Sequence, residues 1–90
     1  MSDEHAVVNN RAANRFEIDV EGEMAVLEYV ETDSTIDLRH TGVPATLEGH
    51  GVGSTLVRAA LEYAKQAGKR VIPTCPFVQA YLKRHVEPDA

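Results

Sequence analysis

The pattern of apolar and polar residues predicts two neighbouring strands in the N-terminal half. In residues 16–21 every second side chain is apolar and those between are acidic, which predicts a strand with one buried face. Residues 24–30 carry apolar side chains at both odd and even positions, so this strand should be central in its sheet. The turn Glu21-Gly22-Glu23 joins the two strands into an antiparallel hairpin.

A third segment of alternation covers residues 35–41. It places Ile36, Leu38 and His40 on one side of a third strand, and Gly42 then bulges or bends the chain. Before residue 16 the sequence shows no period beyond Val7-Val8, which is typical of a loose arm with at most a short edge strand.

The period changes to that of a helix after the glycines at 49, 51 and 53. Apolar residues follow at steps of three to five up to Ala67, and Gly68 is a typical left-handed stop. Residues 70–74 form a brief strand, and Pro76 precedes a second helix over residues 77–85. The inner face of that helix is expected to comprise Phe77, Val78, Tyr81 and Leu82.

The order of these elements predicts an α/β or α+β fold with a mixed sheet. An antiparallel meander of three strands is followed by a β-loop-α-β-α half. Ninety residues form one small domain, residues 1–90, in which we expect residues 1–6 and 87–90 to be loose.

Composition excludes several classes of function. The formal net charge of -5 and the pI of about 5.2 argue against a general nucleic-acid binder. The apolar runs are too short to span a bilayer, and the start lacks a secretory signal, so we expect a cytoplasmic protein without membrane contact. A single cysteine, Cys75, rules out an internal disulfide, and the four histidines lack metal-ligand spacing.

Charge is divided unevenly between the two halves. Residues 1–48 contain 11 of the 14 acids and 3 of the 9 bases. The division is explained either by two solvated faces of different sign or by an anionic ligand on the second half and a cationic one on the first.

Three alternating glycines lead into the first helix. Backbone N–H groups and the helix dipole at such a start suit a phosphate, although glycines that merely turn the chain are the alternative. A P-loop is rejected because Ser54 stands where its lysine should be, and a dinucleotide fingerprint fails because residues 71–74 supply no acid.

The segment Glu48-Gly49-His50-Gly51-Val52-Gly53 resembles the acetyl-coenzyme A signature of the GNAT superfamily of N-acetyltransferases. Further similarity lies in residues 16–18, 25–29, 40–44 and 72–78, and at Tyr81, Arg84 and His85. Together these look like the very small single-domain GNAT-like proteins, over about residues 7–85.

The resemblance implies that a bulge splays the strand before the loop and that pantetheine lies beside this strand. The cofactor-binding residues would then be Val43, whose backbone bonds pantetheine, and the loop, whose N–H groups bond the pyrophosphate: Glu48, Gly49, His50, Gly51, Val52, Gly53 and Ser54. Arg58, Lys83 and Arg84 are candidates for the 3′-phosphate or are simply solvated.

The same resemblance gives two candidate catalytic residues. Tyr81 matches the tyrosine that protonates the coenzyme A sulfur in many members, or it is a core aromatic. Cys75 lies near the thioester in small members, or it is a buried apolar residue; a catalytic role needs a lowered thiol pKa. His40 and Glu28 are the candidates for a general base, and strand alternation decides where they point.

Some positions depart from the family pattern. Glu48 stands where glutamine or arginine is usual, and His50 where a basic residue is common, which lowers the positive charge beside the phosphates. Gly42 stands where relatives often have glutamate. The chain also lacks segments that wall the acceptor site in full GNAT domains. That side should be open or completed by a second subunit, and we expect a monomer or weak homodimer.

The leading hypothesis is an enzyme that transfers acetyl from acetyl-CoA to an unidentified amine. The runner-up is a non-catalytic acyl-CoA-binding or protein-interaction module that has kept the fold. A structural domain without a ligand is a third.

Overall fold

The computed structural model describes residues 6–85 and contains five strands, two α-helices and a short 3-10 helix. The segments expected to be loose lie outside these residues, except for Ala6, which is exposed. In chain order the elements are β1 (Val8–Asn10), β2 (Arg15–Val20), β3 (Glu23–Glu31), β4 (Thr35–Gly42), η1 (Ala45–Leu47), α1 (Val52–Ala67), β5 (Arg70–Pro73) and α2 (Pro76–Arg84).

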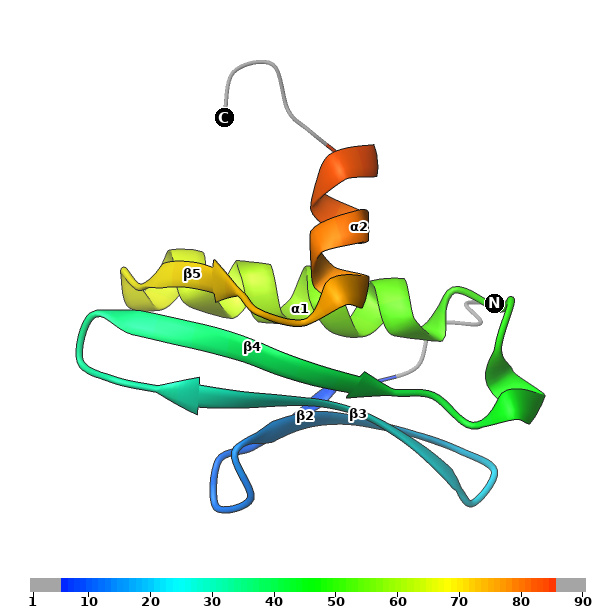
Figure 1. Cartoon of the computed structure of the whole chain (residues 1–90). Coiled ribbons are helices and arrows are strands. Elements are labelled where there is room, and N and C mark those ends of the chain that lie inside the picture. The colour runs from blue at the N-terminus through cyan, green and yellow to red at the C-terminus, as the bar shows by residue number, and fades with distance from the viewer. Residues whose placement is uncertain (1–5, 86–90) are drawn as a thin grey trace.

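The five strands form one mixed sheet in the order β1-β2-β3-β4-β5. The first four are antiparallel, and β4 pairs with β5 in parallel. In Figure 1, α1 lies along the sheet and α2 rises steeply from the end of β5. This arrangement confirms the predicted α+β class, the meander and the β-loop-α-β-α half, and it adds β1 as the short edge strand.

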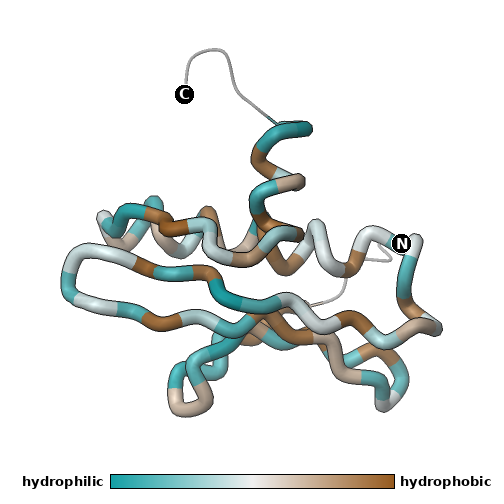
Figure 2. The backbone as a smooth tube through the Cα atoms, in the orientation of Figure 1, coloured by the Kyte–Doolittle hydropathy of each residue, from teal (hydrophilic) through white to brown (hydrophobic). Residues whose placement is uncertain are grey.

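One face of the sheet carries the core. The buried side chains of β2, β3 and β4 belong to one cluster with those of α1 and α2, including Ile18, Leu27 and Leu38, which are fully buried. Figure 2 shows apolar positions scattered between polar ones along the strands. β3 is central as predicted, but Met24 and Val30 on its other face are 41% and 49% exposed. Among residues 6–85, the elements cover only one face of the sheet; we call the other its open face.

A β-bulge in β4 changes which side chains face the core. Glu28 lies opposite His40 and Tyr29 opposite Leu38, so Arg39 has no partner on β3. The extra residue reverses the alternation, because side chains alternate with a period of two. His40 is exposed and does not share the buried side of Ile36 and Leu38, which corrects the sequence prediction.

Both helices begin and end close to where the sequence predicts. Gly51 and Gly68 flank α1 with left-handed φ angles of 77° and 70°. In α2, Val78 and Tyr81 are buried, but Phe77 is 37% exposed and is not part of the inner face as expected. The Phe77 ring lies instead beside Gly53 at the start of α1.

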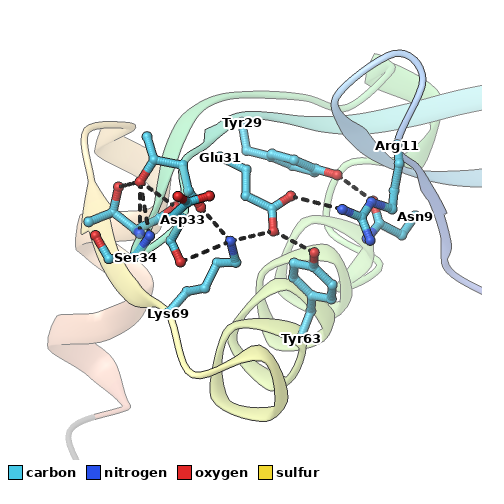
Figure 3. A network of polar contacts seen from close by, with 10 residues as sticks. Asn9, Arg11, Tyr29, Glu31, Asp33, Ser34, Tyr63 and Lys69 are labelled. Carbon is cyan, nitrogen blue, oxygen red and sulfur yellow. Dashed lines mark hydrogen bonds and ion pairs between the residues drawn. The ribbon is translucent and has the colours of Figure 1, made fainter.

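A network of polar side chains lies at the end of the sheet where β3 turns into β4 (Figure 3). The Glu31 carboxylate accepts a hydrogen bond from Tyr63 at 2.5 Å and pairs with Lys69 at 3.2 Å and Arg11 at 3.8 Å. Lys69 also donates to the carbonyl of Thr32. We call Arg11, Glu31, Tyr63 and Lys69 the Glu31 network; it ties β3 to α1 and to the start of β5.

Candidate functional site

β4 and β5 separate at the end of the sheet opposite the Glu31 network. Their pairing runs from Thr35 with Arg70 to Leu38 with Pro73 and goes no further. The Cys75 N–H still donates to the Leu38 carbonyl at 2.8 Å, after which α2 leads the chain away. Beyond Leu38, β4 is paired with β3 alone, so its outer backbone groups face a gap. The bulge and splay expected before the glycine loop are therefore both present.

A cleft of about 650 Å³ lies between the end of β4, the glycine loop and α2. It brings together seven of the eight predicted cofactor-binding residues: Val43, Glu48, Gly49, Gly51, Val52, Gly53 and Ser54. His50 does not line it, and its N–H already donates to the Leu47 carbonyl at 3.3 Å. The other lining residues are Thr41, Gly42, Leu47, Phe77 and Arg84.

The start of α1 presents backbone donors to this cleft. The first intrahelical bond is that of Thr55 to the Gly51 carbonyl at 3.0 Å, which leaves the N–H groups of Val52, Gly53 and Ser54 without helical partners. Within residues 6–85, no side chain caps this end, and its first turn contains no acidic residue. The positive end of the helix dipole is therefore uncompensated within the helix, an arrangement that suits an anion.

The three glycines serve two purposes. Gly49 and Gly51 have φ angles of 85° and 77°, and a Cβ at either would meet nothing within 4 Å. Their role is conformational, as in the alternative in which glycines turn the chain. At Gly53 a Cβ would lie 2.7 Å from Cζ of Phe77. Here glycine makes room for the aromatic ring that forms one wall of the cleft.

Charges in the cleft are mixed. Arg84 lines it from α2, where it was a candidate for phosphate binding, whereas Arg58 and Lys83 are exposed and do not line it. Glu48 contributes a negative charge to the same cleft. An anionic ligand would thus be bound by backbone N–H groups and by one arginine.

Cys75 lies at the point where β4 and β5 separate and is 3% exposed. It occupies the N-cap position of α2, and its Sγ is hydrogen-bonded with Thr41 Oγ1 at 3.3 Å. Burial raises the pKa of the thiol, but Thr41 and the nearby N–H groups of Val78 and Phe77 lower it by more, so the pKa lies below its usual value. The thiol forms no regular capping hydrogen bond, and the helix N–H groups act through proximity.

Tyr81 is buried on α2 and does not line the cleft. Its ring stacks on the exposed imidazole of His85 with centroids 4.1 Å apart. Neither candidate catalytic residue is therefore in open contact with the cleft, although Thr41 links Cys75 to its wall.

Four residues that line the cleft had no predicted role in binding: Thr41, Gly42, Leu47 and Phe77. The apolar spacing of α2 predicts a core position for Phe77. It gives no sign that the ring lies beside Gly53, which belongs to another helix. Thr41 is not singled out by the alternation of residues 35–41, because that pattern carries no signal of the bulge at Arg39. The bulge implied by the family resemblance could have provided this signal.

Comparison with known proteins agrees with this geometry. A family model described as GCN5-related N-acetyl-transferase matches residues 15–90. The chain belongs to the GCN5-related N-acetyltransferase family.

Among its relatives in this family is Protein NATD1 of Xenopus tropicalis, which is 33% identical over 87 residues, covering 92% of this chain and 79% of that protein. Protein NATD1 of Mus musculus and of Homo sapiens are each 32% identical over 86 residues, covering 92% of this chain and 78% and 76% of theirs.

Two features are absent from residues 6–85. No helix there has the length and apolar character needed to cross a membrane. Within the same residues, no three His, Cys, Asp or Glu side chains are grouped to hold a metal ion.

Proposed function

We propose that this protein is an acetyl-CoA-dependent N-acetyltransferase and that acetyl-CoA binds in the cleft between β4, the glycine loop and α2. The observation that carries this proposal is the meeting of uncapped helix N–H groups with an unpaired strand edge in one cleft. The two surfaces suit the two parts of coenzyme A, its phosphates and its amide-containing arm. Acetyl-CoA would supply the acetyl group as a thioester.

The cleft residues would bind and orient the donor. The N–H groups of Val52, Gly53 and Ser54 would hold the pyrophosphate, and Arg84 would add the positive charge that Glu48 and His50 do not provide. The backbone of Val43, beyond the last paired residue of β4, would bond the pantetheine amides as an added strand would.

Cys75 and Tyr81 would act at the inner end of the cleft. A cysteine whose pKa is lowered by Thr41 and a helix start is suited to contact the thioester or to accept acetyl. The Tyr81 hydroxyl would return a proton to the leaving thiolate. Both residues are buried, so each role requires that the arm reach past the lining residues.

A titration of isotope-labelled protein tests the proposal. Acetyl-CoA should produce saturable shifts in the backbone amides of Gly51, Gly53 and Ser54. Coenzyme A without acetyl serves as the matched control, and the differences between the two ligands should concentrate at Cys75 and Tyr81. Unchanged loop resonances at millimolar ligand would overturn the proposal.

The second candidate is a non-catalytic acyl-CoA-binding or protein-interaction module with the same fold. It is favoured by the burial of Cys75 and Tyr81, because neither candidate catalytic side chain lines the cleft. This candidate would be supported over the enzyme if acetyl-CoA shifted the loop amide resonances but no acetyl group was transferred to any of a panel of amines.

A further inference from the structure

A row of charged and polar side chains crosses the open face of the sheet beside the cleft. Arg15 on β2 lies opposite Glu28 on β3, and Glu28 lies opposite His40 on β4. Directly opposed side chains on one face are about 5 Å apart at their Cβ atoms. The bulge at Arg39 creates this row, because without it His40 would face the core.

Glu28 has no cationic partner in this row. The Arg15 guanidinium turns along its strand to Glu17, with Nε 2.6 Å from the carboxylate, and holds the pKa of Glu17 below its usual value. Arg39 is paired with Asp37 at 3.5 Å. Within residues 6–85, Glu28 makes neither an ion pair nor a side-chain hydrogen bond, so its exposed carboxylate is free for a ligand.

His40 connects this row to the cleft. Its Nε2 would lie 3.5 Å from a Cβ built at Gly42, and Gly42 lines the cleft. A side chain at position 42 would stand between the imidazole and this wall. Gly42 therefore adjoins the His40 imidazole on the open face and also lines the cleft, although His40 itself does not line it.

We propose that the acetyl acceptor is a small diamine or polyamine that enters over the open face, with one ammonium bound by Glu28 and the chain of the amine passing His40 toward the gap. This inference rests on the proposed function. The nitrogen that attacks a thioester must be uncharged, so an ammonium that stays paired with Glu28 cannot be the one that reacts. A second amine on the same molecule satisfies both requirements.

The first test is a titration with 1,4-diaminobutane, followed through backbone amides and the His40 ring protons. Saturable shifts at Glu28, His40 and Gly42 are expected, and 1,4-butanediol, which has the same length without charge, should give none. Equal shifts with both compounds, or diamine shifts elsewhere only, would overturn the inference.

Charge removal gives the second test. Glu28→Gln should weaken diamine binding about fivefold, the effect of an exposed ion pair of about 1 kcal/mol, and raise the KM for diaminobutane more than it lowers kcat. Glu62→Gln removes an equal charge from α1 and should change neither. An unaltered diamine affinity in Glu28→Gln would overturn the inference.

The acetyl-CoA titration separates the two proposals. If acetyl-CoA shifts the loop amides while diamine binding is absent at Glu28, the acceptor site is wrong and the proposed function stands. If diamine binds at Glu28 but acetyl-CoA leaves the loop unchanged, the proposed function fails and Glu28 has no role in acetyl transfer.

Discussion

The two ends of the β4–β5 pair differ in how their polar groups are satisfied. At one end, which we call the closed end, Glu31 is bonded to Tyr63 and Lys69, and Lys69 is bonded in turn to a main-chain carbonyl. At the other, which we call the open end, the two strands separate, and the N–H groups at the start of α1 have no partner within the helix. The same two strands are therefore fixed at one end and left free for a ligand at the other, which separates the residues that hold the fold from those proposed to bind.

The largest expected effect comes from breaking the closed end. Glu31→Ala leaves the partly buried Lys69 ammonium and the Tyr63 hydroxyl without their carboxylate, and should lower the free energy of unfolding by about 2–3 kcal/mol. Urea unfolding measures this change. Acetyl-CoA affinity of the folded variant should not change.

A matched variant removes an acid outside the network. Glu62→Ala on α1 takes away an exposed carboxylate and should alter stability by less than about 0.5 kcal/mol. If Glu31→Ala weakened acetyl-CoA binding as strongly as it weakened the fold, the two ends would not be independent.

The next effect compares the two ends of α1. Gly51 and Gly68 have similar left-handed backbone angles, and alanine at either should cost about 1–2 kcal/mol of stability. Only Gly51 lies in the cleft, so only Gly51→Ala should also weaken acetyl-CoA binding, by about tenfold if the loss is near 1.4 kcal/mol. Calorimetric titration of both variants measures the difference. If the two variants bound acetyl-CoA with equal affinity, the glycine loop would not be part of the binding site.

The sequence predicts the elements packed around the core better than it predicts the residues on the open face and around the cleft. Alternation and helical period locate β2, β3, α1 and α2 to within a residue or two, because burial on one face determines which positions are apolar. The same reasoning places His40 with Leu38 and Phe77 in the core, and both assignments are wrong. A bulge adds one residue without changing composition, and the position of Phe77 depends on a glycine 24 positions earlier in the chain.

The glycine loop was found from its spacing, but the spacing could not assign a reason to each glycine. Positive φ at Gly49 and Gly51 and the contact between Gly53 and Phe77 appear only in three dimensions. Likewise, no charged neighbour in the sequence of Cys75 suggests a lowered pKa. Its causes are Thr41, from a distant strand, and the helix that Cys75 itself begins.

A smaller effect is expected where α1 meets α2. Gly53→Ala places a methyl group against the Phe77 ring, which is half-exposed at the cleft and can swing aside. The helix gains up to about 1 kcal/mol in propensity, so stability should change little while the displaced ring weakens acetyl-CoA binding a few-fold. Titration of the variant measures this affinity.

Phe77→Ala provides the background that isolates the contact. In that variant Gly53→Ala should be more stabilising than in the natural chain, because no ring opposes the methyl group. Urea unfolding of the four proteins gives the coupling free energy. A coupling of zero would mean that the ring does not restrict position 53.

The finest distinction concerns the thiol at the point where the strands separate. Thr41→Val keeps the shape of the side chain but removes its hydrogen bond to Cys75 Sγ, so the pKa of the thiol should rise toward its ordinary value. Thiolate absorbance near 240 nm, followed against pH, should therefore appear at higher pH in Thr41→Val. Thr35→Val, on the same strand at the closed end, should leave the Cys75 titration unchanged, because among the described residues the Thr35 hydroxyl bonds only Thr32. If Thr41→Val left the titration in place, the Thr41 hydroxyl would not contribute to the lowered pKa, which would then come from the backbone groups of Val78, Phe77 and Thr41.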